Sequence, residues 1–117
     1  MLTIKEIAEH ANKTARMHGK YGDDPERAIV EKLLEEIDEL ETAIYGQNYG
    51  HYPMDSKDND KFKASFEEHT KDTVGAELAD IIITALAGAV ELGIPIELNI
   101  ERGLRYNRLR KYDEENN

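Results

Sequence analysis

The chain of 117 residues contains no cysteine and no tryptophan. Without cysteine it can form neither disulfides nor thiolate metal sites, which fits a reducing cytoplasm. Long apolar runs are also missing, since the longest, from Ile81 to Val90, is too short to span a bilayer. The first ten residues, MLTIKEIAEH, lack the basic region and apolar run of a signal peptide. We therefore expect a cytoplasmic protein that does not enter the membrane.

Positive charge is scarce as well. The chain has 15 Lys and Arg residues against 25 Asp and Glu residues, which gives a formal net charge of −10. Such a surface argues against binding to nucleic acid or to an anionic membrane. It still allows a small anionic ligand if cations or a local basic patch neutralise the site. The length predicts a single domain over residues 1–117.

Apolar residues recur at helical spacing, and no strand pattern competes with them. The pattern predicts four helices and an all-α, four-helix bundle-like core. A Thr3–Glu6 capping box opens the first helix and Asp24-Pro25 opens the second. A Ser65–Glu68 capping box predicts that helix resumes near Ser65, either continuing unbroken or breaking near residues 72–73. The expected helical segments are residues 3–19, 24–46, 65–92 and 95–112, with a loop insertion at 46–61 and a frayed tail at 113–117.

The segment from Val74 to Leu92 is the most apolar helix, yet it carries Glu77 and Asp80. Residues three apart lie on the same face of a helix, so these two carboxylates point the same way. A helix that is apolar nearly all round is normally buried. Buried carboxylates are costly unless they are paired, hydrogen-bonded or bound to a metal. This conflict is the main indication of a functional site.

The second predicted helix repeats the same spacing with Glu36 and Glu39. If the two helices pack as antiparallel neighbours, four carboxylates converge, and they cannot all stay ionised without a counter-charge. Mg2+ prefers such oxygen ligands, and helix bundles build metal sites from facing helices. The alternative is that the acid-rich run LLEEIDELE is simply a solvated face.

The last predicted helix holds the only dense basic cluster. Asn107 lies one turn beyond Leu104 and is expected to face inward. Together with Arg105 and Arg110 it could bind phosphate oxygens. Basic residues near a helix C-terminus can instead complement the helix dipole, and we prefer this interpretation for Arg108 and Lys111.

Aromatic and polar side chains offer candidates for contact with a base. They lie at the exit of the first helix and in the 46–61 loop. Both histidines among them are more typical of ordinary surface residues than of ligands, and mobile surface tyrosines are as common as stacking ones. The candidates are Asn12, His18, Tyr21, Tyr49, His51 and Tyr52.

The order of these motifs resembles MazG-like, all-α nucleoside triphosphate pyrophosphohydrolases, which are related to dimeric dUTPases and dCTP pyrophosphatases. The resemblance covers roughly residues 29–111 and includes LLEEIDELETAI, AELADIIITALAGAVELGIPIE and RYNRLR. The chain departs from the family in its long 46–61 loop and in Gly103, which stands where a lysine is usual. Both departures leave the choice of substrate open.

The resemblance implies hydrolysis of a nucleoside triphosphate between its α- and β-phosphates, which releases a monophosphate and pyrophosphate. It implies Mg2+, which Mn2+ could replace, held by Glu36, Glu39, Glu77 and Asp80. Either Glu36 or Glu39 would accept the proton of the attacking water. It also implies phosphate contacts from the last helix, and a homodimer or homotetramer. Two other classes stay open: a non-catalytic acidic helical module that binds a protein partner, and a metal-binding bundle with another substrate.

Overall fold

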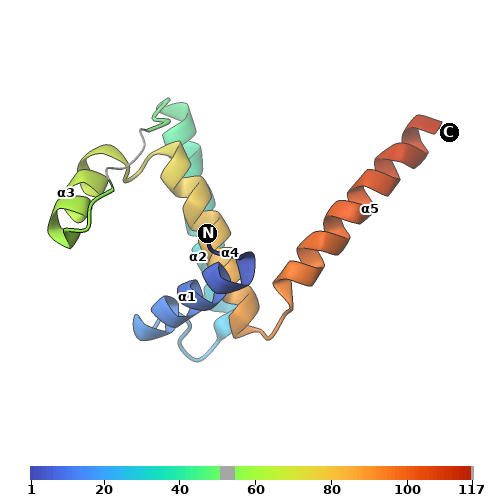
Figure 1. Cartoon of the computed structure of the whole chain (residues 1–117), viewed down its shortest axis with the longest axis horizontal. Helices are drawn as coiled ribbons and strands as arrows, with labels where there is room; N and C mark the ends of the chain where they lie inside the picture. Colours follow the sequence, from blue (N-terminus) through green and yellow to red (C-terminus); the bar gives the residue numbers. More distant parts are fainter. Residues whose placement is uncertain (51–54, 117) are drawn as a thin grey trace.

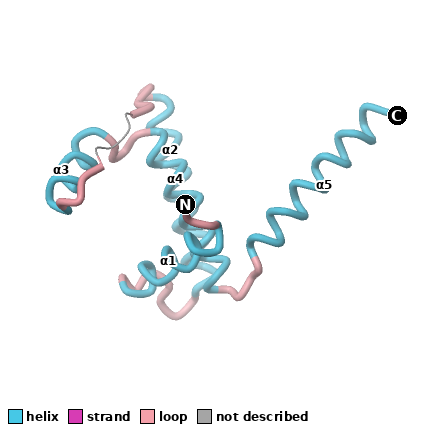
Figure 2. Tube along the Cα trace, in the orientation of Figure 1, coloured by secondary structure: helices cyan, strands magenta, loops and turns pink. Residues whose placement is uncertain are grey.

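The structure, a computed structural model, describes residues 1–50 and 55–116, with side chains described as far as Arg110. It is built from helices joined by loops and turns, and no strand occurs in these residues (Figures 1 and 2). The helices are α1 (Ile4–Met17), α2 (Pro25–Tyr45), α3 (Asn59–His69), α4 (Val74–Glu91) and α5 (Ile96–Asn116). The prediction of an all-α protein is confirmed.

Local capping interactions explain where α1 and α2 begin. Thr3 accepts a hydrogen bond from the Glu6 amide at 3.1 Å, and Glu6 accepts one from the Thr3 amide, so the predicted capping box is present. Asp24 caps α2 by accepting from the Arg27 amide at 3.2 Å, with Pro25 at the first helical position. Proline suits this position because its missing N–H would have no partner inside the helix.

The helices α2 and α4 lie side by side and run in opposite directions (Figure 1). At one end Ile29 lies against Gly88, where an added Cβ would come within 3.0 Å of two Ile29 carbons. At the other end the Val74 amide donates to the Asn48 carbonyl at 2.7 Å. The antiparallel packing that convergence of the four acids would require is therefore present, with contacts near both ends of the helix pair.

The helix α1 packs across the C-terminal part of α4. Asn12 is buried and donates to the Ala87 carbonyl and to Glu91, each at 3.2 Å. Arg16 forms an ion pair with the same carboxylate at 2.7 Å. Asn12 was a candidate for base recognition, but these bonds give it the structural role of holding α1 on α4. The small core is made of Ala8, Ala43, Val74, Leu86, Ala87 and Ala89.

The region between α2 and α4 differs from the prediction. Helix begins at Asn59 rather than near Ser65, because Asp58 caps it by accepting from the amides of residues 60 and 61. The proposed Ser65–Glu68 capping box is therefore wrong. The helix α3 does not run on into α4. A turn that contains Asp72, whose φ is 65°, separates them, and Thr73 caps the start of α4. The break near residues 72–73, one of the two alternatives, is confirmed.

The helix α5 does not complete a bundle. It contacts α1 and α4, and the rest of it extends away from the other helices (Figure 1). Leu104 is 61% exposed and Asn107 is exposed, so the expectation that Asn107 faces inward is wrong within this chain. The helix also continues to Asn116, through most of the segment expected to fray. The bundle-like core thus consists of α1, α2 and α4.

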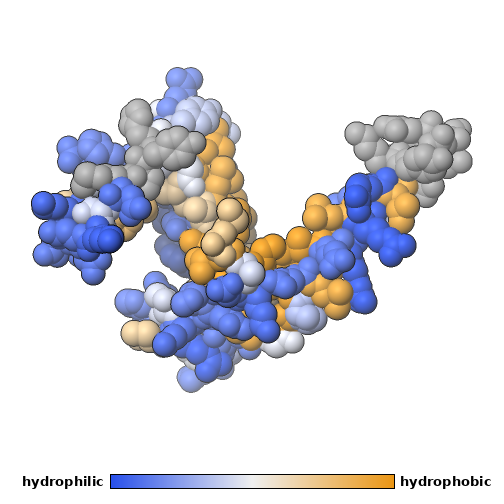
Figure 3. Space-filling model, viewed as in Figure 1, coloured by the Kyte–Doolittle hydropathy of each residue, from blue (hydrophilic) through white to orange (hydrophobic). Residues whose placement is uncertain are grey.

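The helix α4 is less buried than its composition predicts. Ile82 is 58% exposed, and Leu78 and Ile83 are also exposed. Apolar residues are visible over α2 and α4 and again along α5 (Figure 3). In the described part of the chain no single helix meets the length and hydropathy expected of a membrane span. The pair α3 and α4 meets them only when taken together across its 115° bend.

Candidate functional site

Two acids from α2 and two from α4 meet where these helices pack. Glu36 and Glu77 are each only 3% exposed, whereas Glu39 and Asp80 are exposed. Thr73 sets the position of α4 by accepting from the Ala76 amide at 3.2 Å. On each helix, one carboxylate of the i, i+3 pair is thus buried and the other is exposed.

Glu36 is held from both helices. Thr84 on α4 donates to Glu36 Oε1 at 2.8 Å, and the Lys32 ammonium lies 4.0 Å from the same oxygen. Burial raises the pKa of Glu36, and Thr84 and Lys32 oppose this shift. The second carboxyl oxygen, Oε2, is buried without a hydrogen-bond partner. Hydrogen bonding thus fixes Oε1 of the carboxyl, whereas Oε2 lacks a hydrogen-bond partner.

Glu77 has the largest pKa shift among the four acids. Burial raises its pKa to about 7, assisted by a hydrogen bond to Glu39 and by the negative charges of Glu39, Asp80 and Asp72. Its Oε2 is also buried without a partner. Near neutral pH this carboxyl is therefore only partly ionised, as expected when neighbouring carboxylates lack a counter-charge.

The other acids are part of the same electrostatic network. Partial burial raises the pKa of Asp80, and the charge of Glu39 raises it further, while Lys32 lowers it. Glu36 in turn is affected by the charges of Asp80 and Glu39. Each of the four predicted metal ligands thus interacts with at least two of the others.

Lys32 is the cation of this network and was not predicted from the sequence. It lies 3.3 Å from Glu35 and 4.0 Å from Glu36. Burial lowers its pKa, but Glu35, Glu36 and Glu39 outweigh this effect and raise the pKa above its ordinary value. Its position one turn before Glu36 was the available signal, because residues four apart share a helix face.

The acids are adjacent without forming a finished metal site. Within residues 1–50 and 55–116, no three His, Asp or Glu side chains are already arranged to hold a metal ion. The donor chemistry nevertheless suits Mg2+, which prefers carboxylate oxygens. The two unpartnered oxygens, on Glu36 and Glu77, are the atoms that a cation would satisfy.

Three hollows lie at or near the acids. A small one of about 420 Å3 is lined by Glu39 and Glu77. A second, which we call the α1 hollow, has a volume of about 440 Å3 between α1, α2 and α4, and includes Lys32 and Thr84 in its wall. The third, which we call the α3 hollow, has a volume of about 680 Å3 between α3, α4 and the chain after α2, and includes Asp80.

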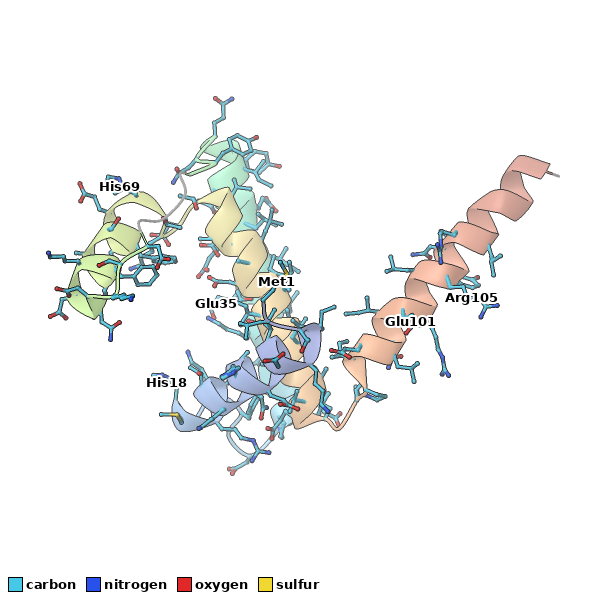
Figure 4. All side chains as sticks on the ribbon, in the orientation of Figure 1. Met1, His18, Glu35, His69, Glu101 and Arg105 are labelled. Atoms are coloured by element: carbon cyan, nitrogen blue, oxygen red, sulfur yellow. The ribbon has the colours of Figure 1, made fainter. Side chains whose placement is uncertain are left out.

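The candidate base-binding residues fall in different hollows. His18 and Tyr21 line the α1 hollow, and Tyr49 lines the α3 hollow. Figure 4 shows His18 at the far end of α1, away from α3. Tyr52 and His51 lie outside the described residues. The single chain therefore offers two separate places for a base.

The predicted phosphate-binding residues are not near the acids within this chain. Arg105, Asn107 and Arg110 are exposed on α5, and Figure 4 shows Arg105 on the part of the helix that extends from the body. Arg110 lies 6.0 Å from the Tyr106 ring centre, which is a cation–π distance on the same helix. One chain alone does not bring these side chains to Glu36 or Asp80.

Comparison with known proteins adds no identification. No family model, no curated protein and no solved structure matches the chain. The functional conclusion therefore depends on the sequence motifs and on the geometry of the acids.

Proposed function

We propose that this protein is a Mg2+-dependent nucleoside triphosphate pyrophosphohydrolase, which cleaves the α–β phosphate bond and contributes to nucleotide-pool housecleaning. The observation that carries the proposal is the pair of buried carboxyl oxygens without partners, on Glu36 and Glu77, in a network of four acids. A buried acidic group without compensation is costly, so a native site of this kind calls for a cation. The ordered ExxE and ExxD motifs support the same reaction.

Glu36, Glu39, Glu77 and Asp80 would hold the cation. Bound Mg2+, or Mn2+ in its place, would offset the triphosphate charge and make a bound water more acidic. The exposed carboxylate of Glu39 can reach a substrate from solvent, whereas Glu36 is fixed by Thr84. We assign Glu39 the better position for accepting the water proton, with Glu36 as the alternative.

The arginines of α5 can contribute to the proposed site only if they reach the acids of a second copy of the chain. Leu98, Leu104 and Leu109 are exposed on α5, and Ile82 is exposed on α4, so both helices have apolar surface to bury. We propose a homodimer or homotetramer in which Asn107, Arg105 and Arg110 bind the triphosphate held by another subunit.

A non-catalytic acidic module that binds a partner protein is the second candidate. The exposed apolar residues of α2, α4 and α5 favour it, because large apolar surfaces mark interaction sites. Such a module does not require two buried carboxyls on its central helix pair. This difference ranks the enzyme first.

The deciding experiment measures pyrophosphate and monophosphate release from a panel of NTPs and dNTPs, with Mg2+ and with EDTA. We expect metal-dependent turnover of at least one nucleotide. Binding of Mg2+ alone, measured by calorimetry, tests the acids separately from catalysis. A folded protein that binds Mg2+ but turns over no member of an extended panel, modified nucleotides included, would favour the metal-binding bundle with another substrate. A folded protein that shows neither nucleotide turnover nor Mg2+ binding would favour the interaction module.

A further inference from the structure

The α3 hollow is the larger of the two named hollows, and an acid of the site forms part of its wall. Asp80 lines it directly, and the small side chains of Ala76 and Ala79 cover the adjoining surface of α4. Its volume of about 680 Å3 falls within the roughly 300–1,000 Å3 usual for small-molecule sites. A ligand that fills this hollow would therefore lie beside one acid of the network.

The segment that follows α2, residues 48–50, is held against the N-terminus of α4 by hydrogen bonds and by close packing. The Val74 amide donates to the Asn48 carbonyl at 2.7 Å, and the Asn48 side chain donates to the Asp72 carbonyl at 3.3 Å. Gly50 has a φ of +86°, and a Cβ there would lie 2.6 Å from Thr73 Cβ. Only glycine fits such a position, both in conformation and in space. These contacts fix the backbone that carries Tyr49 at the edge of the hollow.

The helix α3 has no other evident packing role. In the described part of the chain it packs against no other helix, and Figure 2 shows it joined to the body only by loops. Its Phe66 nevertheless lines the hollow and is half-buried, while Phe62, 6.0 Å away between ring centres, does not line it. One aromatic ring of α3 thus lines the same hollow as Asp80, and its neighbour does not.

We infer that the α3 hollow binds the nucleoside of the triphosphate whose phosphates lie at the acid network, with Phe66 and Tyr49 as aromatic contacts to the base. The inference rests on the proposed function and extends it to Phe66, a specificity residue outside the four acids. An aromatic side chain stacks on any base through its π face. The competing α1 hollow approaches the acids only through Lys32 and Thr84.

The first test compares Phe66→Ala with Phe62→Ala, two changes of the same size one turn apart on α3. Loss of a base-stacking ring costs about 1–3 kcal/mol, so we expect KM to rise roughly 5- to 150-fold in Phe66→Ala. The value of kcat should change much less. The Phe66→Tyr variant, which keeps an aromatic ring, should have a KM close to that of the wild type. Phe62→Ala should leave KM within about twofold, because this ring does not line the hollow. Equal effects of both alanines on KM and on Tm would overturn the inference, since they would indicate a structural role for α3.

The second test fills each hollow with the same side chain. Ala79→Phe occupies the α3 hollow, Ala15→Phe occupies the α1 hollow, and Ala64→Phe on α3 lines neither. We expect a raised KM in Ala79→Phe and near-normal values in the other two variants. A raised KM confined to Ala15→Phe would overturn the inference, assign the nucleoside to the α1 hollow, and leave the proposed reaction intact.

A binding measurement gives a readout independent of turnover. The probe is a set of α,β-methylene nucleoside triphosphates with Mg2+, added to the wild-type chain while backbone amides are followed by NMR. We expect shifts at residues 48–50, 66 and 76–80. Shifts confined to residues 10–21 would overturn this inference alone. No shift for any analogue in a folded protein would overturn both the inference and the proposed function.

Discussion

Thr84 on α4 donates a 2.8 Å hydrogen bond to Oε1 of Glu36 on α2. This is a side-chain bond between the two helices that carry the acids, and it joins residues 48 positions apart in the chain. The opposite oxygen of the same carboxyl has no partner. The bond therefore fixes the orientation of Glu36 and leaves Oε2 available to a ligand.

Replacing Thr84 by valine keeps the shape of the side chain and removes the donor. Because the Glu36 carboxyl then loses its hydrogen bond while staying buried, we expect unfolding free energy to fall by about 1–3 kcal/mol. Chemical denaturation measures this change. The control is Thr42→Val, since the exposed Thr42 hydroxyl only donates to the Asp38 carbonyl on its own helix. A loss no larger than that of the control would contradict the role assigned to Thr84.

Neutralising an exposed acid should affect catalysis far more than folding. We expect Glu39→Gln and Asp80→Asn each to lower kcat by roughly 10²- to 10⁴-fold, because each removes a charged oxygen that serves the cation or the water. Circular dichroism should show unchanged helix content. Glu41→Gln, on the same helix but outside the network, should retain full activity. Near-normal rates in either site variant would rule out its assigned role.

Stability without divalent cations should depend on pH through Glu77. Its pKa rises from an ordinary value of 4.5 to about 7 on folding. Between these values the folded state binds more protons than the unfolded state, so stability is greatest at the acidic end of this range. We expect Tm, recorded in EDTA, to fall as the pH rises from about 4.5 through 7. Glu77→Gln should weaken this dependence and leave a part that arises from Glu36 and Asp80, whose pKa values are also raised. A dependence as steep as that of the wild type would contradict the pKa shift.

Sharing of the site between subunits can be tested by mixing two inactive variants. Glu39→Gln removes an acid of one copy and Arg110→Ala removes a phosphate contact supplied by another. Co-expressed in equal amounts as dimers, they should recover about one quarter of the wild-type rate, since half of the dimers are mixed and each has one intact site. If Arg110 acts within its own chain, no site is intact and no activity returns. Full activity of Arg110→Ala alone would exclude its phosphate role.

The acid pairs and the helices that carry them could be predicted because their signals are local. The Thr3 capping box, the Asp24-Pro25 start and the i, i+3 spacing of the acids all act within one turn. The antiparallel pairing of α2 with α4 was the condition for the four acids to converge, and the structure meets it. The burial of Glu36 and Glu77 agrees with this reasoning.

The other features of the structure were not predictable from local sequence. They depend on competition between alternative helix caps or on contacts between residues that are far apart in the chain. Both Asp58 and Ser65 are acceptable caps, and the sequence alone did not show that α3 begins at the first. The orientation of α5 depends on what covers Leu104, which no pattern within the helix reveals. Phe66 could not be singled out from the sequence, because the hollow that it lines forms only where separate segments of the chain meet.

The close contact of Gly88 with Ile29 has a consequence for cation size. The acids lie between this contact and the Asn48–Val74 hydrogen bond, so these two contacts, together with the Thr84–Glu36 bond, hold the facing helices in place. Mg2+ requires oxygens at about 2.0–2.1 Å, whereas Ca2+ accepts about 2.3–2.6 Å. A methyl group at position 88 would require the Ile29 side chain to move by a few tenths of an ångström, at a contact more than two turns away from Asp80. In the proposed metal site, the fit of either ion would therefore depend in part on a residue that touches neither ion nor substrate.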